Sequence, residues 1–447
     1  MNTRPTPLPE MAPMPRRSIL GLMLGGALHV AGCGGGTSVA GVSSGGTGSF
    51  TPGTGGTGSF TAGTIVGIGS IIVNGVRYDD RTAQVGDIDD DSTPSHWTAD
   101  RLQLGMVVAV QGSNVVPTTA TGVDYTHEGV ADRIVVIPEL LGPVSGVSVQ
   151  RDGSGVVTAL TFSVLGQAVT WQLDTLVAID DVRSEAAVED TIQDGVLVEV
   201  HGLWDSAVAS WQATRINVLT TSPSFYRLSG SLSDIATDRQ AFSISGQPVR
   251  SSVGPLDSAW GDGQRVRAVL NPQIQAGLWS ASQVRAADWS AVPLLAWRAA
   301  ELDGREAELE GIVPNYSGTR FVFEGVQVDV SALLQPLQAG QRVELKGVFS
   351  GEVLMVSDVE SDEEPDRELK GYEVHGTITR APTSVSAGVM GLSLTDTKGQ
   401  TYRVRYDAQT EVEGVLSQGA WAKAKLVLQR DGSWYASKLE QEDPDDD

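Results

Sequence analysis

Residues 195–216 read GVLVEVHGLWDSAVASWQATRI, and two patterns in this stretch decide the fold. Apolar residues recur at every second position between Gly195 and Gly202, which is the period of a pleated β-strand. After a short polar turn, the run from Trp211 to Ile216 again places apolar side chains at strand spacing. The stretch therefore predicts two consecutive β-strands.

Both patterns recur along the chain, preceded each time by a third. The third pattern is an apolar residue, a glycine four positions later, and Val or Tyr three positions after that. Its copies are Ile71/Gly75/Tyr78, Phe162/Gly166/Val169, Phe242/Gly246/Val249, Phe321/Gly325/Val328 and the longer Leu394/Gly399/Tyr402. The glycine-led strand recurs from Gly105, Gly263, Gly340 and Gly419, and the tryptophan pattern recurs from Trp279 and Trp434. A constant order through five copies predicts a tandem-repeat protein.

Each repeat contains five predicted strands, because another short strand precedes the glycine hairpin. Five strands with the longest connection between the third and the fourth resemble the OB fold. We predict an all-β chain of five tandem, small, OB-like, five-stranded β-barrel repeats. The predicted barrels span 62–139, 140–222, 225–289, 305–361 and 370–442. The remaining segments are a possible helical linker at 290–304, an acidic linker at 362–369 and an acidic tail at 443–447.

The first 32 residues have the features of an export signal. Arg16 and Arg17 precede the apolar run from Ile19 to Ala31, which is too short to span a bilayer. The small residues before Cys33, the single cysteine of the chain, resemble a bacterial lipobox. This resemblance implies that Cys33 is diacylated and becomes the new amino terminus.

Residues 33–61 are rich in Gly, Ser and Thr and predict a flexible tether. Gly34 stands where an aspartate would resemble the inner-membrane retention rule. We therefore expect an outer-membrane lipoprotein of the cell envelope, facing the periplasm or the surface, which contacts the membrane through its lipid anchor.

The stretches SIIVNGVRY (70–78) and LGMVVAVQG (104–112) resemble the bacterial domain of unknown function 5666. Members of that family are typically exported proteins with tandem copies. The resemblance covers about residues 63 to 440, is closest in the first repeat, and is looser in the third and fifth. It implies the architecture and leaves the activity open.

The net charge of −24 bears on the partners of this chain. OB folds often bind nucleic acid, but so acidic a surface repels phosphate backbones. We therefore expect no nucleic-acid partner and consider envelope proteins or glycans instead. One cysteine also excludes an internal disulfide and a zinc site built from cysteines.

Alternating carboxylates at Asp87, Asp89 and Asp91 are the candidate ligands of a metal, with Ca²⁺ as the cofactor they would suit. The glycine and glutamate of an EF-hand are missing at the required offsets, so an acidic loop in solvent is the favoured alternative.

Histidines and tryptophans are the other candidate functional residues. His201 and His375 lie in strand patterns without a second ligand at fixed spacing, and we expect them on the surface. Trp211, Trp279 and Trp434 share one repeat position, which favours core packing. The candidates for stacking on a ligand are the tryptophans outside that register, namely Trp171, Trp204 and Trp260.

Three functions remain open from the sequence. The favoured interpretation is a non-catalytic scaffold or adaptor, because the repeats share no polar residue, and no catalytic residue is predicted. The first alternative is a ligand-binding module for a glycan, a peptide or a divalent cation. The second alternative is a hydrolase with a site between repeats, which needs a convergent His/Asp/Ser or metal group that the sequence does not reveal.

Overall fold

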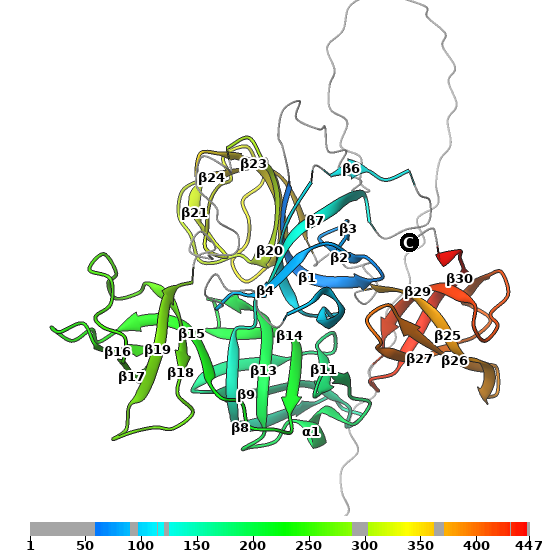
Figure 1. The fold of residues 1–447 in the computed structure, drawn as a ribbon, viewed down its shortest axis with the longest axis horizontal. Coiled ribbons are helices and arrows are strands. Elements are labelled where there is room, and N and C mark those ends of the chain that lie inside the picture. The colour runs from blue at the N-terminus through cyan, green and yellow to red at the C-terminus, as the bar shows by residue number, and fades with distance from the viewer. Residues whose placement is uncertain are drawn as a thin grey trace, which may run out of the picture. The chain divides into compact units, whose positions relative to one another are not determined.

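The computed structural model describes residues 59–89, 97–113, 115–119, 125–287, 303–361, 371–429 and 431–444. The predicted signal peptide, Cys33, Asp91, most of the tether and the acidic linker lie outside the described residues, as does nearly all of the predicted helical linker. In the described part, the helices are the one-turn α1 (Val188–Thr191) and the 3₁₀ turn η1 (Ala99–Arg101). No helix among these residues is long and apolar enough to span a bilayer. The predicted all-β class is confirmed (Figure 1).

The first group of strands, barrel 1, closes on itself through five pairings. Antiparallel pairing links β1 to β2 and β2 to β3, parallel pairing links β3 to β7, and antiparallel pairing links β7 to β5 and β5 to β1. This order is that of a five-stranded OB-like barrel. The five strands of the ring are β1 (Ser59–Ile68), β2 (Ile71–Val73), β3 (Val76–Asp79), β5 (Val107–Gly112) and β7 (His127–Val136). Two further short strands belong to the same group, β4 (Gln84–Asp87) and β6 (Val116–Pro117).

Barrels 2, 3 and 5 repeat the same closed ring of pairings. Barrel 2 contains β8 (Leu140–Arg151), β9 (Val157–Val164), β10 (Gln167–Trp171), β11 (Leu176–Ile179), β12 (Val182–Arg183), β13 (Leu197–Asp205) and β14 (Ser210–Leu219). Barrel 3 contains β15 (Tyr226–Ser233), β16 (Ala241–Ile244), β17 (Gln247–Ser251), β18 (Arg265–Leu270) and β19 (Trp279–Ala286). Barrel 5 contains β25 (Gly371–Ser386), β26 (Val389–Asp396), β27 (Thr401–Tyr406), β28 (Glu411–Glu413), β29 (Trp421–Leu428) and β30 (Trp434–Gln441).

Barrel 4 shares the hairpin, the parallel pair and the two antiparallel pairs that involve its fourth strand. Its strands are β20 (Glu306–Ile312), β21 (Arg320–Phe323), β22 (Val326–Asp329), β23 (Arg342–Ser350) and β24 (Val353–Ser361). The outer limits of the five repeats stay predictions.

The repeated glycine pattern forms the same hairpin in every group. Its first and last residues are direct cross-strand partners in all five, as in Ile71 with Tyr78 and Phe162 with Val169. Four of these hairpins have two-residue turns in which both residues have positive φ, for example 50° at Asn74 and 72° at Gly75. Such turns match the twist of the flanking strands and require φ values that glycine adopts without strain. This explains why the glycine recurs.

The glycine that closes the strand pattern has a different cause. Gly112, Gly202 and Gly347 each lie at a β-bulge, where the register to the last strand of the barrel shifts. A Cβ atom at Gly347 would lie 2.2 Å from the carbonyl oxygen of Met355, so no larger residue fits without movement of the backbone. Barrels 3 and 5 have the same bulge with leucine, at Leu270 and Leu426.

The barrels are joined through their first strands. Ser59 to Ala62 of β1 pair with β5 on one side and, in parallel, with Glu306 to Leu309 of β20 on the other. The end of β1 pairs with β25, and β15 pairs with β8 at Arg227 and Leu141. Backbone pairing therefore joins barrels 1, 4 and 5 in one sheet and barrels 2 and 3 in another. Figure 1 shows how these strands are arranged.

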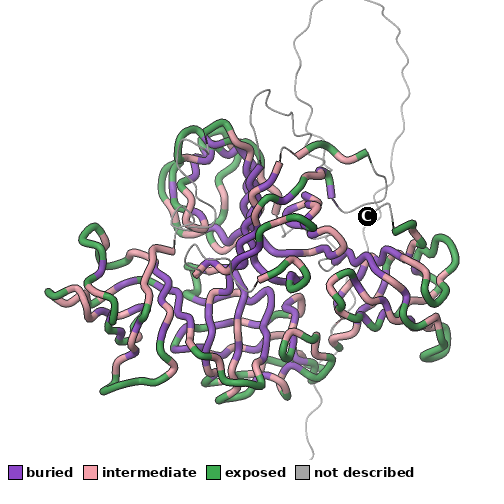
Figure 2. The backbone as a smooth tube through the Cα atoms, viewed as in Figure 1, coloured by how far each residue is buried: buried purple, intermediate pink, exposed green. Residues whose placement is uncertain are grey.

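The hydrophobic core is also shared between barrels. One cluster joins barrels 1 and 5 and includes Leu176 of barrel 2, a second joins barrels 2 and 3, and a third joins barrels 1 and 4. In Figure 2 the buried residues follow the strands, and the exposed ones lie mainly in the turns. Because each cluster includes side chains from at least two barrels, the repeats do not pack as independent domains.

Candidate functional site

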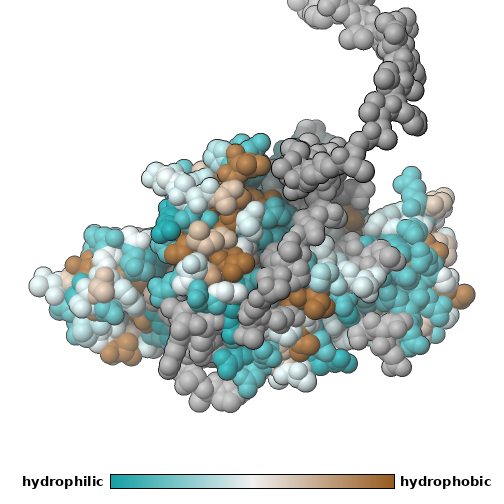
Figure 3. Space-filling model, turned by 90° about the horizontal axis from the view of Figure 1, so that it is seen from above, coloured by the Kyte–Doolittle hydropathy of each residue, from teal (hydrophilic) through white to brown (hydrophobic). Residues whose placement is uncertain are grey.

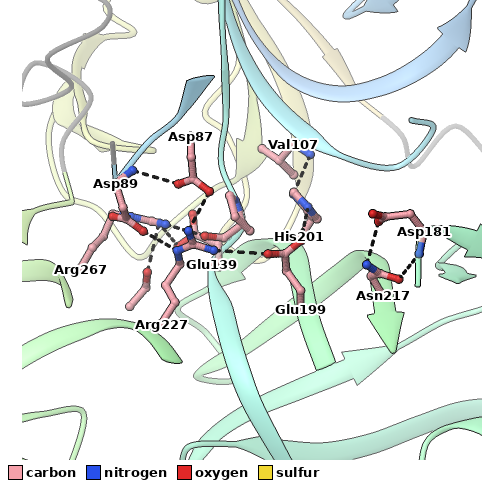
Figure 4. Close-up of polar contacts among 12 residues, drawn as sticks. Asp87, Asp89, Val107, Glu139, Asp181, Glu199, His201, Asn217, Arg227 and Arg267 are labelled. Atoms are coloured by element: carbon pink, nitrogen blue, oxygen red, sulfur yellow. Dashed lines mark hydrogen bonds and ion pairs between the residues drawn. The ribbon is translucent and has the colours of Figure 1, made fainter. Parts of the chain in front are cut away.

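The acidic residues of the first repeat lie at a junction of three barrels, and we call this group the arginine cluster. Asp87 ends β4, and Asp89 follows it with its N–H donating to Asp87 Oδ1 at 2.9 Å. Arg227, only 1% exposed, extends from β15 of barrel 3 toward both carboxylates (Figure 4). The cluster consists of Asp87, Asp89, Glu139, Glu199, Arg227 and Arg267.

Arg227 is held by carboxylates from two other barrels. Its Nη2 donates to Asp87 Oδ2 at 2.8 Å and its Nε donates to Asp89. Its Nη1 lies 3.5 Å from Glu199 Oε2, on β13 of barrel 2. A buried guanidinium with planar, hydrogen-bonded carboxylate partners is the geometry in which charge burial is tolerated.

Arg267 of β18 lies beside Arg227 and adds a second set of contacts. It donates through Nη1 to Glu139 Oε2 at 2.7 Å and to Ser229 Oγ at 3.1 Å, and through Nη2 to the carbonyl of Pro138. Its Nε lies 3.5 Å from Asp89 Oδ1. The two arginines thus connect barrel 3 to barrel 1, to barrel 2 and to the segment between those two barrels.

Four carboxylates face two guanidinium groups, and the pKa values of the two aspartates shift in opposite directions. Burial raises the pKa of Asp89, but Arg267 and Arg227 outweigh that effect and hold it below its ordinary range. Burial raises the pKa of Asp87 in spite of Arg227, with Asp89 and Glu199 acting in the same direction. The predicted Ca²⁺ ligands Asp87 and Asp89 therefore already have cationic partners.

The calcium site itself stays a prediction, because Asp91 lies outside the described residues. In the described part of the chain, no group of three or more His, Cys, Asp or Glu side chains is arranged to hold a metal ion.

Both histidines that we expected on the surface are buried, so that prediction was wrong. His201 is fully buried, and its Nδ1 accepts the N–H of Val107 at 3.3 Å from barrel 1 (Figure 4). His375 lies between two glutamates, with Nε2 at 2.9 Å from Glu373 Oε1 and Nδ1 at 3.1 Å from Glu442 Oε2. The outward face of a strand is buried here wherever another barrel covers it.

The repeat register predicts the packing of three tryptophans but does not separate them cleanly from the stacking candidates. Trp211, Trp279 and Trp434 are 1%, 8% and 3% exposed and belong to the shared core clusters, which confirms their packing role. Among the stacking candidates, Trp171 is buried and donates through Nε1 to the carbonyl of Thr175 at 3.2 Å. Trp204 and Trp260 are partly exposed and pack against the core of barrels 2 and 3.

Trp204 lines a cleft of about 640 Å³. The guanidinium of Arg265 lies 5.7 Å from the centroid of the Trp204 ring and 5.3 Å from that of Trp211. The cleft is lined by four barrels, and its charged residues are Glu139, Arg265, Glu310, Glu324 and Glu352.

The pKa of one carboxylate in this cleft is raised above its ordinary value. Burial raises the pKa of Glu324 to about 7, partly offset by Arg265, while Glu139 and Glu310 add to the rise. The cleft has a volume typical of small-molecule sites and combines an indole, one cation and several acceptors. Chemically it can bind a ligand that has both polar and apolar parts.

The model of the family described as "Domain of unknown function (DUF5666)" matches residues 154–217 and 375–440, which is consistent with tandem copies of that domain. The matches fall on barrels 2 and 5, not on the first repeat, and cover less of the chain than the expected 63 to 440.

A solved structure described as "drosophila Unr CSD456" is similar at 12% sequence identity with a TM-score of 0.14, covering 50% of this chain and 98% of that chain. No curated protein matches.

The residues that sequence reasoning missed are the two arginines of the cluster and Arg265. Arg227 lies 138 and 140 positions along the chain from its partners Asp89 and Asp87. Arg267 lies 128 positions from Glu139 and 178 positions from Asp89. The only signal in the sequence is a basic residue at an outward position of a strand that is otherwise small or apolar. With 55 acids in the chain, that signal does not identify the partners.

Proposed function

We propose that this chain is a lipid-anchored, non-catalytic scaffold of the bacterial cell envelope. One observation carries the proposal: strands of different barrels pair with one another, and the barrels share hydrophobic cores and a buried ionic cluster, so they form a continuous body and not five separate modules. A body of this kind holds surfaces on different barrels in a fixed arrangement. That property suits an adaptor that binds envelope proteins or glycans.

The surface is consistent with a role in which the chain stays soluble beside the membrane. On the face drawn in Figure 3, hydrophobic residues lie in separate patches among hydrophilic ones. With a net charge of −24, the barrels repel anionic head groups, and attachment then depends on the lipid at Cys33 and the tether that follows. The 640 Å³ cleft offers one place on this body where a partner or small ligand would be held.

The anchor is tested by replacing Cys33 with serine in the full chain. We expect the native protein to incorporate a labelled fatty acid and to sediment with outer membranes. The Cys33→Ser variant should lose the label and appear in the soluble periplasmic fraction. Serine at the neighbouring Gly34 is the matched control and should change neither result. Unchanged membrane association of Cys33→Ser would contradict the anchor.

A further inference from the structure

A second cavity, of about 320 Å³, lies on barrel 5, at a distance in sequence from the cluster and cleft described above. It is lined by β25, β26, β27 and the turn before β30, with Glu185 of barrel 2 at its edge. Three arginines line it, Arg380, Arg403 and Arg405. The chain has 31 basic and 55 acidic residues, so three arginines around one cavity are unusual for this chain and call for an explanation.

The backbone places these arginines around the cavity by two devices. Arg403 and Arg405 alternate along β27 with Val404, which is buried, so both arginines point out of the barrel on the same face. Arg380 lies between two consecutive register shifts of the β25–β26 hairpin, one after Ile378 and one before Thr383. Bulges of this kind re-aim single side chains, and they are common beside binding sites.

The ion pairs that two of these arginines already form are weak, so a ligand could displace the carboxylates in them. Arg403 pairs with Glu185 at 2.8 Å and Arg405 pairs with Asp431 at 3.0 Å, but all four side chains are between 46% and 75% exposed. Exposed ion pairs of this kind contribute about 0–1 kcal/mol. Arg380 is exposed and has no ion pair within the residues that the structure describes.

The rest of the lining is suited to a hydroxylated ring. Trp434, Leu392 and Val404 give an apolar floor, and Thr383, Ser393 and Ser433 line the same cavity. Ser433 Oγ lies 3.3 Å from Arg405 Nη1. Arg183 of barrel 2 stacks on Trp434 at 4.6 Å from the ring centroid and donates to the carbonyl of Gly432 at 2.6 Å. Arg183 therefore holds two residues of the lining in place without lining the cavity itself.

We propose that this cavity binds an acidic sugar through its carboxylate. Guanidinium groups recognise a carboxylate through paired, charged hydrogen bonds. Three arginines line this cavity. The neighbouring hydroxyls, Glu185 and Asp431 are partners for sugar hydroxyl groups, and the apolar floor suits the face of the ring. The chain's overall negative charge disfavours a long polyanion and favours a short ligand with a single carboxylate. This site does not depend on the scaffold role.

The test is saturation-transfer NMR on the full chain with D-glucuronate as the probe. D-glucose, which has the same ring without the carboxylate, and inorganic phosphate, which has the charge without the ring, are the comparison ligands. We expect a dissociation constant for glucuronate of the order of 1 mM, and at least about tenfold weaker binding of the other two. Arg380→Gln and Arg405→Gln should each weaken glucuronate binding by about tenfold.

Arg151→Gln is the matched control, because Arg151 forms a similarly exposed pair with Glu189 of barrel 2. It should leave the affinity for glucuronate unchanged. Equal binding of glucuronate by the Arg380→Gln variant would overturn the proposed site. Binding of phosphate as tight as that of glucuronate would overturn the proposed ligand, and no detectable binding of glucuronate would overturn both.

Discussion

Replacing Arg227 by methionine is expected to lower the free energy of unfolding by about 3–5 kcal/mol, the largest effect of any single substitution considered for this chain. Methionine fills much of the same volume, so the main change is the loss of the guanidinium. Asp87 and Glu199, with side chains 12% and 17% exposed, would then lose their cation while remaining largely shielded from water. Chemical denaturation of the full chain measures the effect.

Two further variants separate this electrostatic effect from simple damage. Arg151→Met removes an exposed pair and should cost no more than about 1 kcal/mol. Adding Asp87→Asn to Arg227→Met removes one of the uncompensated charges and should recover part of the lost stability. A change of less than about 1 kcal/mol for Arg227→Met would contradict the structural role of the arginine cluster.

The second large effect concerns pH and Glu308 of β20. Burial raises the pKa of Glu308 to about 8, partly offset by Lys346 and reinforced by Glu344 and Glu360. Between the ordinary value of 4.5 and about 8, the folded chain therefore binds a proton that the unfolded chain has released. The free energy of unfolding must fall as pH rises through this range, by at most about 1.4 kcal/mol per pH unit for one proton.

Glu308→Gln removes this titration, because glutamine stays neutral at every pH. Lys346 keeps its other partner, Glu360 Oε1 at 2.7 Å. We expect the variant to be less sensitive to pH between 5 and 8 and more stable than the native chain above pH 8, as measured by thermal unfolding at several pH values. Glu411→Gln, at an exposed position of β28, should retain the native pH dependence. An unchanged slope in Glu308→Gln would show that Glu308 ionises normally in the folded protein.

The parts of the fold that were predictable from sequence are those set by neighbouring residues. The hairpin pairs, such as Phe242 with Val249, follow from alternation and from a glycine turn that only a few residues satisfy. The packing of Trp211, Trp279 and Trp434 follows from their shared position in the repeat. The hairpin signal lies within about ten residues and the tryptophan signal lies in the comparison of repeats, so a single sequence contains both.

The junctions between barrels were not predictable in this way. Alternation identifies the outward face of a strand and implies contact with solvent, but barrel packing buries that face at His201, Arg227 and Arg267. Asp87 and Asp89 were correctly singled out as unusual, and their partners are arginines from another repeat, which no local pattern indicates. The same reasoning missed the cavity of barrel 5, because Arg380 is positioned by β-bulges that no sequence pattern predicts.

The account rests on the fusion of the barrels into one body, and amide hydrogen exchange in β1 tests this most directly. From Ser59 to Ala62, β1 is paired on both sides, with β5 of its own barrel and with β20 of barrel 4. Successive amides of a strand point to opposite neighbours, so each side has its own set of reporters. If the barrels are fused, the amides that face β20 exchange as slowly as those that face β5. If the β20-facing amides exchange at the rate of an open edge while the β5-facing amides stay protected, the barrels are separate and the scaffold proposal is wrong.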